Sequence, residues 1–107
     1  LQTSYNVVEQ RARTSGLLKA ARAAGMGVIA KRPIANGSFG PKESPLAYAD
    51  TYFGRAQEVL GQGELPDRPS DYIELSLAFT LDQPEIDTAI VGTRNPAHMR
   101  TNIALLE

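Results

Sequence analysis

The sequence predicts an α/β protein built on a parallel sheet. Short runs of β-branched and apolar residues alternate with longer segments whose apolar residues recur at helical spacing. Strands that alternate with helices pair in parallel, with the helices packed on the sheet. We therefore expect about three successive βα units, with one further helix inserted between the second strand and its helix.

The first predicted unit extends from the N-terminus to Gly25. Residues 1–8 form the expected strand, and residues 9–13 form a charged connector. Thr14 or Ser15 then caps a helix that ends at the glycine, where helices commonly stop. The apolar face of this helix comprises Leu17, Leu18, Ala21 and Ala24.

The second unit begins with the apolar run 27–30, which is typical of a parallel strand buried on both faces. The glycines, proline and asparagine of residues 31–40 predict a loop whose backbone can approach a ligand closely. The inserted helix is expected over 46–60, followed by a loop to Pro69, and Ser70 caps the unit's own helix. The expected apolar positions of the two helices are Tyr52, Phe53, Ala56, Val59 and Leu60, and Ile73, Leu77, Ala78 and Leu81.

The third unit has a strand over 87–91 and the clearest helix start in the chain. Asn95 is expected as the N-cap, and Pro96 takes the first helical position, where its missing N–H has no effect on helix hydrogen bonding. The predicted buried stripe of this helix comprises Met99, Ile103 and Leu106.

Two parallel architectures fit this order of elements: an open doubly wound sheet and a (β/α)₈ barrel. Three strands are too few for either, and no Gly-x-Gly-x-x-Gly turn follows the first strand, as it would in a dinucleotide-binding open sheet. The pattern favours a part of a barrel. Because the chain opens inside an apolar strand, we expect it to be a piece of a longer protein.

Composition excludes several function classes. The 107 residues include 11 basic and 12 acidic side chains, and this balance argues against a nucleic-acid partner. No apolar run approaches the roughly 18 residues of a membrane span. The absence of cysteine rules out disulfides and thiolate zinc sites and is compatible with a cytoplasmic protein, and one histidine is too few for a multi-histidine metal site.

An anion site is predicted where the third strand meets the last helix. Thr93, Arg94 and His98 gather at a helix N-terminus, where unpaired N–H groups and the helix dipole favour negative charge. Phosphate sites in barrels often lie between loops that follow neighbouring strands, and loop 33–40 is such a neighbour. These residues suggest a phosphate or diphosphate ligand, and the alternative is an ordinary helix cap with a surface arginine.

Other candidates are less specific. Lys31 and Arg32 end the middle strand and either face a ligand or form a solvated rim. Gln2 offers an amide that can pair with another amide. Tyr5 and Tyr48 either pack at the edge of the core or form pocket walls.

Three blocks of the sequence, residues 1–6, 27–37 and 86–103, together resemble the C-terminal part of the aldo-keto reductases. Residues 75–84 resemble the seventh barrel helix of that family, whereas 40–69 match no motif. The resemblance implies a (β/α)₈ barrel, with this chain as its sixth to eighth strands. It also implies an NADP(H) cofactor and the reduction of a small carbonyl substrate to an alcohol.

The resemblance also assigns cofactor contacts. Gln2 matches the glutamine that holds the nicotinamide carboxamide, and Lys31 stands where the family has an aromatic residue stacked on the nicotinamide. His98 stands where many members have an arginine for the 2′-phosphate, so NAD(H) remains an alternative. The segment implied to embrace the pyrophosphate contains Arg32, Pro33, Ile34 and Asn36, and the adenosine-phosphate motif contains Thr93, Arg94, His98 and Asn102.

No part of the chain matches the family's catalytic aspartate, tyrosine, lysine and histidine, so we expect those residues on a missing N-terminal half. The alternative function is a non-catalytic module that holds a nucleotide or self-associates through exposed strand edges.

Overall fold

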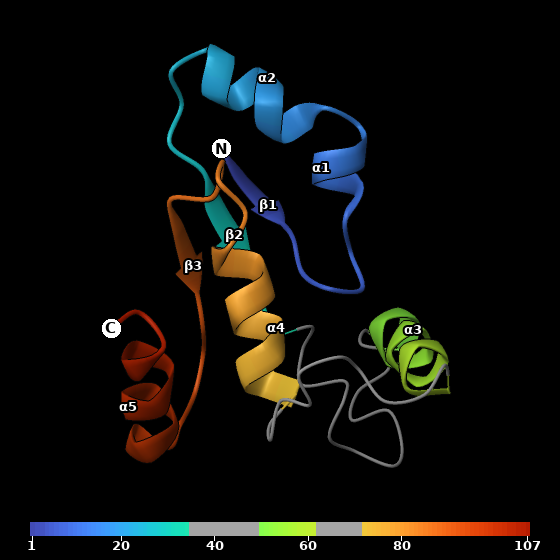
Figure 1. Ribbon diagram of the computed structural model, residues 1–107, viewed down its shortest axis with the longest axis vertical. Helices are drawn as coiled ribbons and strands as arrows, with labels where there is room; N and C mark the ends of the chain where they lie inside the picture. The colour runs from blue at the N-terminus through green and yellow to red at the C-terminus, as the bar shows by residue number, and fades with distance from the viewer. Residues whose placement is uncertain (35–49, 62–71) are drawn as a thin grey trace.

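The computed structural model describes residues 1–34, 50–61 and 72–107, which form a parallel sheet with helices packed on one side (Figure 1). The predictions for Asn36, Tyr48, Ser70 and the loops around them lie outside these residues. The elements are β1 (Gln2–Ser4), α1 (Arg11–Thr14), α2 (Leu17–Ala23), β2 (Ile29–Lys31), α3 (Asp50–Gly61), α4 (Tyr72–Leu81), β3 (Thr88–Ile90) and α5 (Pro96–Ala104).

The three strands follow sequence order, β1-β2-β3, and both pairs are parallel. In the middle row of the sheet, Thr3 lies opposite Ala30, which lies opposite Ala89. This arrangement confirms the predicted α/β class with parallel strands and an inserted helix. Each strand is only three residues long, and the expected strand over 1–8 ends at Ser4 because Asn6 and Glu9 pair with each other in a tight turn.

The two faces of the sheet have different environments. Successive strand residues point to opposite faces, and Val28 and Ala30 are fully buried beneath the helices, whereas Ile29 between them is 36% exposed. The prediction that this strand is buried on both faces is therefore wrong for the described residues, because their helices cover one face only. The open face carries Gln2, Ser4, Ile29, Lys31, Thr88 and Ile90.

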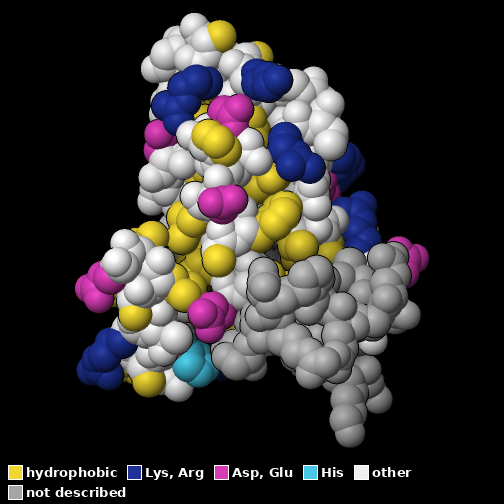
Figure 2. All heavy atoms as spheres, in the orientation of Figure 1, with side chains coloured by type: hydrophobic (Ala, Val, Ile, Leu, Met, Phe, Trp, Pro, Cys, Tyr) yellow, Lys and Arg dark blue, Asp and Glu magenta, His cyan; other side chains and the backbone are white. Residues whose placement is uncertain are grey.

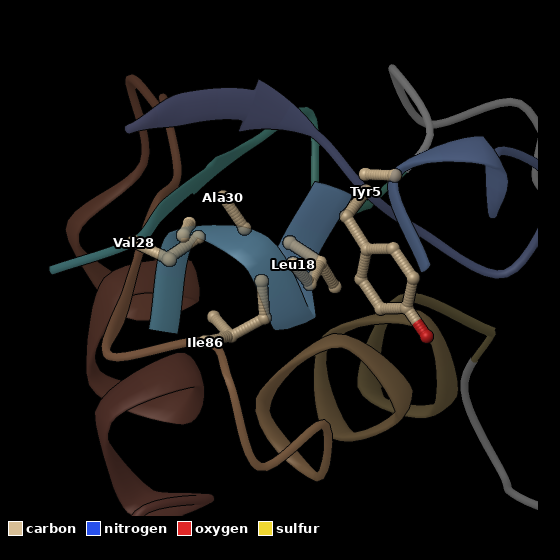
Figure 3. Packing of buried hydrophobic residues seen from close by; sticks show 7 residues of the cluster. Tyr5, Leu18, Val28, Ala30 and Ile86 are labelled. Carbon is tan, nitrogen blue, oxygen red and sulfur yellow. The ribbon is translucent and has the colours of Figure 1, made fainter. Parts of the chain in front are cut away.

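The core lies between the sheet and the helices (Figure 3). Tyr5 occupies its edge, where its ring stacks on Phe79 with centroids 5.7 Å apart and its hydroxyl donates to Gln83 Oε1 at 3.1 Å. Of the two expectations for Tyr5, packing is therefore the correct one. The buried cluster comprises Tyr5, Ala12, Leu18, Ala21, Val28, Ala30 and Ile86.

The expected charged connector contains a short helix, α1, because one of its residues, Ala12, packs into the core. Consequently α2 begins at Leu17, and the residue before it, Gly16, has a φ of +83°, in the left-handed region that glycine tolerates. The predicted cap by Thr14 or Ser15 is wrong, since the Thr14 hydroxyl bonds back to the Gln10 carbonyl.

The last helix starts as predicted. Asn95 Oδ1 accepts a hydrogen bond from the Ala97 amide at 2.9 Å, and Pro96 takes the first helical position. The predicted burial of Met99, Ile103 and Leu106 is wrong, because these side chains are 37%, 50% and 68% exposed. They line an apolar groove of about 260 Å³ between α5 and α4, where hydrophobic side chains reach the surface (Figure 2).

On α4 the predicted apolar face is only partly buried. Leu77 is 3% exposed and Leu81 is half-buried, whereas Ile73 is 38% exposed and Ala78 is exposed. The buried side of α4 instead includes two hydroxyl residues, Ser76 and Thr80. Thr80 can be buried because its hydroxyl is hydrogen-bonded to backbone carbonyls.

Candidate functional site

The strand ends gather the candidate residues, because all three parallel strands point their carboxyl ends toward the same edge of the sheet (Figure 1). β2 continues there into residues 32–34, and β3 continues into the turn that precedes α5. The predicted residues that the structure describes lie at or near these exits and on the open face of β1.

The chain that leaves β2 is held by hydrogen bonds to three consecutive backbone carbonyls. The Lys31 carbonyl accepts from the Tyr5 amide at 3.3 Å, and the Arg32 carbonyl accepts from Asn6 Nδ2 at 2.9 Å. The Pro33 carbonyl lies 3.3 Å from the Thr80 hydroxyl. The donors come from the turn after β1 and from α4, so two separate elements hold the start of the predicted ligand loop.

Arg32 has an unusual backbone conformation at this exit. Its φ is +58°, in the left-handed region that side-chain-bearing residues rarely adopt. Its guanidinium donates to Ser4 Oγ at 2.8 Å and remains exposed. A cation therefore lies at the carboxyl ends of β1 and β2.

A second group of predicted residues surrounds a pocket of about 160 Å³ beside the start of α5. We call it the α5 pocket; it is lined by Ile34, Ile73, Val91, Gly92, Thr93, His98, Thr101 and Asn102. Four of the predicted cofactor residues, Ile34, Thr93, His98 and Asn102, thus meet although they come from two distant segments. Thr101 was not predicted as a site residue. It lies three residues after His98 in α5, so the two side chains are neighbours on the helix surface.

The turn before α5 is organised by its own polar side chains. The Asn95 amide donates to Thr93 Oγ1 at 3.1 Å, and the Asn95 side chain accepts from Ala97. Arg94 and His98 are exposed, and within the described residues neither side chain forms a hydrogen bond or an ion pair. Figure 2 shows the histidine at the surface at one end of the molecule. This end of α5 therefore presents a helix N-terminus with a cation that is available for an anion.

Gln2 and Lys31 lie elsewhere, beside a pocket of about 410 Å³ along the outer edge of β1. Both residues belong to the open face of the sheet, on adjacent strands. Pro33 is buried and contributes its carbonyl rather than a ligand-facing surface. The predicted cofactor residues therefore form two groups, one on the open face and one at α5, joined by the exit of β2.

Near the first group, the buried carboxylate of Glu9 forms ion pairs with the exposed Arg11 and the half-buried Arg55. The Glu9 carboxylate accepts two hydrogen bonds from the Arg11 guanidinium, each 2.7 Å long, and one from Arg55 Nη1 at 3.1 Å. The hydrogen bonds from Arg11 are the main reason that the pKa of Glu9 falls to about 2. Glu9 therefore stays ionised at neutral pH and acts as an anchor for charges rather than as a proton donor.

Metal chemistry has no support in the described residues, where no three histidine, cysteine or acidic side chains are placed to share an ion. None of the helices in the same residues is long and apolar enough to cross a membrane.

The comparisons with known proteins identify relatives. The profile described as "Aldo/keto reductase family" matches residues 1–107, whereas no curated protein matches. Among solved structures, the fold is similar to an aldo-keto reductase from Bacillus halodurans in its holo form, with a TM-score of 0.70 and 18% sequence identity. That match covers 99% of this chain and 36% of the other, which agrees with the predicted architecture of a partial barrel.

Proposed function

Since the chain belongs to the aldo/keto reductase family, we propose that it is the dinucleotide-binding part of an oxidoreductase that reduces small aldehydes or ketones to alcohols. The observation that carries this proposal is the α5 pocket, where Ile34, Thr93, His98 and Asn102 meet, with the exposed Arg94 next to Thr93 in the sequence. A capped helix N-terminus with a nearby cation suits a phosphate group.

The two groups of residues suggest how the cofactor is divided between them. Thr93, Arg94, His98 and Asn102 would hold the adenosine and its phosphate, and the segment that starts at Arg32 and includes Asn36 would hold the pyrophosphate. Gln2 and Lys31, on the open face, would contact the nicotinamide, which supplies the hydride when it is bound. NADP(H) is the proposed cofactor, with NAD(H) as the alternative because a histidine rather than an arginine occupies position 98.

No catalytic residue is proposed within this chain. Residues 1–107 would form the last three βα units of the barrel, and the proton donor and its partners would belong to its N-terminal half. The cytoplasm is the proposed location.

The proposal is tested with Arg94→Ala in the full-length protein. Loss of one charge-assisted hydrogen bond typically costs about 1–3 kcal/mol, so we expect the Kd for NADPH, measured by fluorescence titration, to rise by about 5- to 150-fold. Arg100→Ala is the matched control, because Arg100 is an exposed cation within α5, away from the turn before the helix that carries Arg94. Equal affinities of the wild type and Arg94→Ala would contradict the proposal.

A second candidate function, self-association, has one observation in its favour. Within the described residues β1 and β3 are edge strands, each paired on one side only. Ile90, in β3, is 52% exposed. Such edges and apolar surfaces favour pairing with another chain.

A further inference from the structure

We propose that Asn6 and Thr80 are positioning residues for the dinucleotide. They hold the backbone carbonyls of Arg32 and Pro33, and so set the direction in which the chain leaves β2 and enters the ligand loop. This inference rests on the proposed function, because it assigns a role to residues that would not touch the cofactor.

Asn6 is fully buried, and its orientation is determined by its partners. Its Oδ1 accepts from the Val8 amide at 2.9 Å, so the Nδ2 group must face the other way, toward the Arg32 carbonyl at 2.9 Å. The backbone of Asn6 is itself fixed by two hydrogen bonds with Glu9, of 3.0 and 3.1 Å. The donor that holds Arg32 is therefore itself held in place.

Thr80 is also fully buried and approaches the same exit from α4. Its hydroxyl lies 3.0 Å from the Ser76 carbonyl, 3.3 Å from the Pro33 carbonyl and 3.4 Å from the Tyr5 carbonyl. A single hydroxyl proton serves these acceptors, so Thr80 is the weaker of the two donors. Its position nevertheless places a donor at the carbonyl that follows the one held by Asn6.

The backbone conformation of Arg32 explains why the hydrogen bonds from Asn6 and Thr80, which we call the clamp, are needed. A φ of +58° is strained for a residue with a Cβ atom and persists where surrounding contacts over-determine it. Here the contacts are the hydrogen bonds to the carbonyls of residues 31–33. With the clamp in place, the Arg32 guanidinium lies near Ser4 while Ile34 enters the wall of the α5 pocket.

The test compares two ligands on the full-length protein. NADPH carries the complete pyrophosphate and the nicotinamide, whereas adenosine 2′,5′-bisphosphate carries the part assigned to α5 and only one of the two phosphates of the pyrophosphate. Thr80→Val removes the hydroxyl at nearly constant volume, and Thr80→Ser retains it. We expect Thr80→Val to raise the Kd for NADPH at least fivefold and the Kd for the bisphosphate less than twofold, with Thr80→Ser leaving both within twofold of wild type.

Asn6→Asp provides a second, independent variant in case Thr80→Val does not fold. An aspartate keeps the acceptor for Val8, but once ionised its carboxylate has no proton for the Arg32 carbonyl. Because burial raises the pKa of an aspartate, binding is measured at about pH 8, well above the ordinary range of that pKa. We expect the same selective loss of NADPH affinity, by at least tenfold, as measured by calorimetry. Equal weakening of both ligands, or unchanged affinity for NADPH in folded variants, would overturn the inference. Failure of the wild type to bind either ligand would instead overturn the proposed function and the inference with it.

Discussion

Glu9 shows how strongly a single side chain depends on its neighbours in this protein. Its carboxylate is only 5% exposed, yet it is ionised, because two arginines offset the cost of removing it from water. Its pKa of about 2 lies below the ordinary value of 4.5. A lowered pKa means that the folded state favours the ionised form, so this stabilisation is present above about pH 4.5 and is lost as the pH falls toward 2.

Glu9→Gln should therefore destabilise the protein in a pH-dependent way. A shift of one pKa unit corresponds to about 1.4 kcal/mol, so the full shift would correspond to about 3.5 kcal/mol. Because both arginines reach the solvent, which screens their charges, we expect a loss of about 2–3 kcal/mol in the free energy of unfolding at pH 7. The difference from wild type should shrink at pH 3 and nearly vanish near pH 2. Urea unfolding at these pH values measures it, with Glu58→Gln, an exposed carboxylate of α3, as the control. A difference independent of pH would show that the ion pairs are not its source.

Some residues of the candidate site could be predicted from the sequence and others could not, for a physical reason. Thr93 and His98 could be predicted because a helix N-terminus is a local feature, encoded by Asn95 and Pro96. Asn6 and Thr80 could not, because the carbonyls they hold lie 26 and 47 residues away in the sequence. The role of a buried polar residue can be inferred only when the structure shows which distant group it bonds to.

At the level of the elements, α5 links stability and anion binding through one side chain. Asn95→Ala removes the oxygen that accepts from Ala97, and the loss of such a cap costs about 1 kcal/mol. Asn95→Asp retains an acceptor and should leave the free energy of unfolding nearly unchanged. Its added negative charge at the helix start should nevertheless weaken NADPH binding several-fold. Denaturant unfolding and ligand titration of the two variants separate the effects, and an unweakened aspartate variant would argue against a phosphate at this helix.

The inserted helix α3 is attached to the turn after β1 by Arg55. The Nη1 atom of this arginine donates to the Val8 carbonyl at 2.8 Å and to Glu9 Oε2 at 3.1 Å. Arg55→Ala should therefore raise hydrogen-exchange rates over α3 about tenfold while leaving those of α2 unchanged, because helices of this length depend on tertiary contacts. Gln57→Ala, at an exposed position of the same helix, is the control. Equal exchange in the two variants would exclude Arg55 as the anchor.

The helix boundaries agree with the prediction where neighbouring residues in the sequence determine them. They differ from it where tertiary packing determines them. The Asn95-Pro96 start is correct for the first reason. The predicted start of α2 is not correct, because burial of Ala12 forms α1 and moves the cap position of the next helix to Gly16. Both faces of β2 seemed apolar in the sequence, but only a structure shows which face the helices cover.

For the whole molecule, the one-sided sheet has a direct consequence for solution behaviour. The open face and the apolar groove leave Ile90, Ile103 and Leu106 at least half exposed. We expect the 107-residue chain by itself to self-associate at micromolar concentrations, as measured by sedimentation velocity. Ile103→Lys should reduce the association, whereas Thr101→Lys, at an exposed position of the same helix, should change it less. A monomer at all concentrations would exclude self-association through these surfaces.

The stacked rings of Tyr5 and Phe79 also provide an intrinsic spectroscopic probe of the fold. The chain contains four tyrosines and no tryptophan, so its near-ultraviolet signal is not dominated by an indole. Burial raises the pKa of Tyr5, which keeps its phenol protonated in alkaline solution that ionises an ordinary tyrosine. The ring lies where β1, α2 and α4 meet. Its circular dichroism band and its ionisation at a raised pH would therefore show, without any attached label, whether that junction is intact.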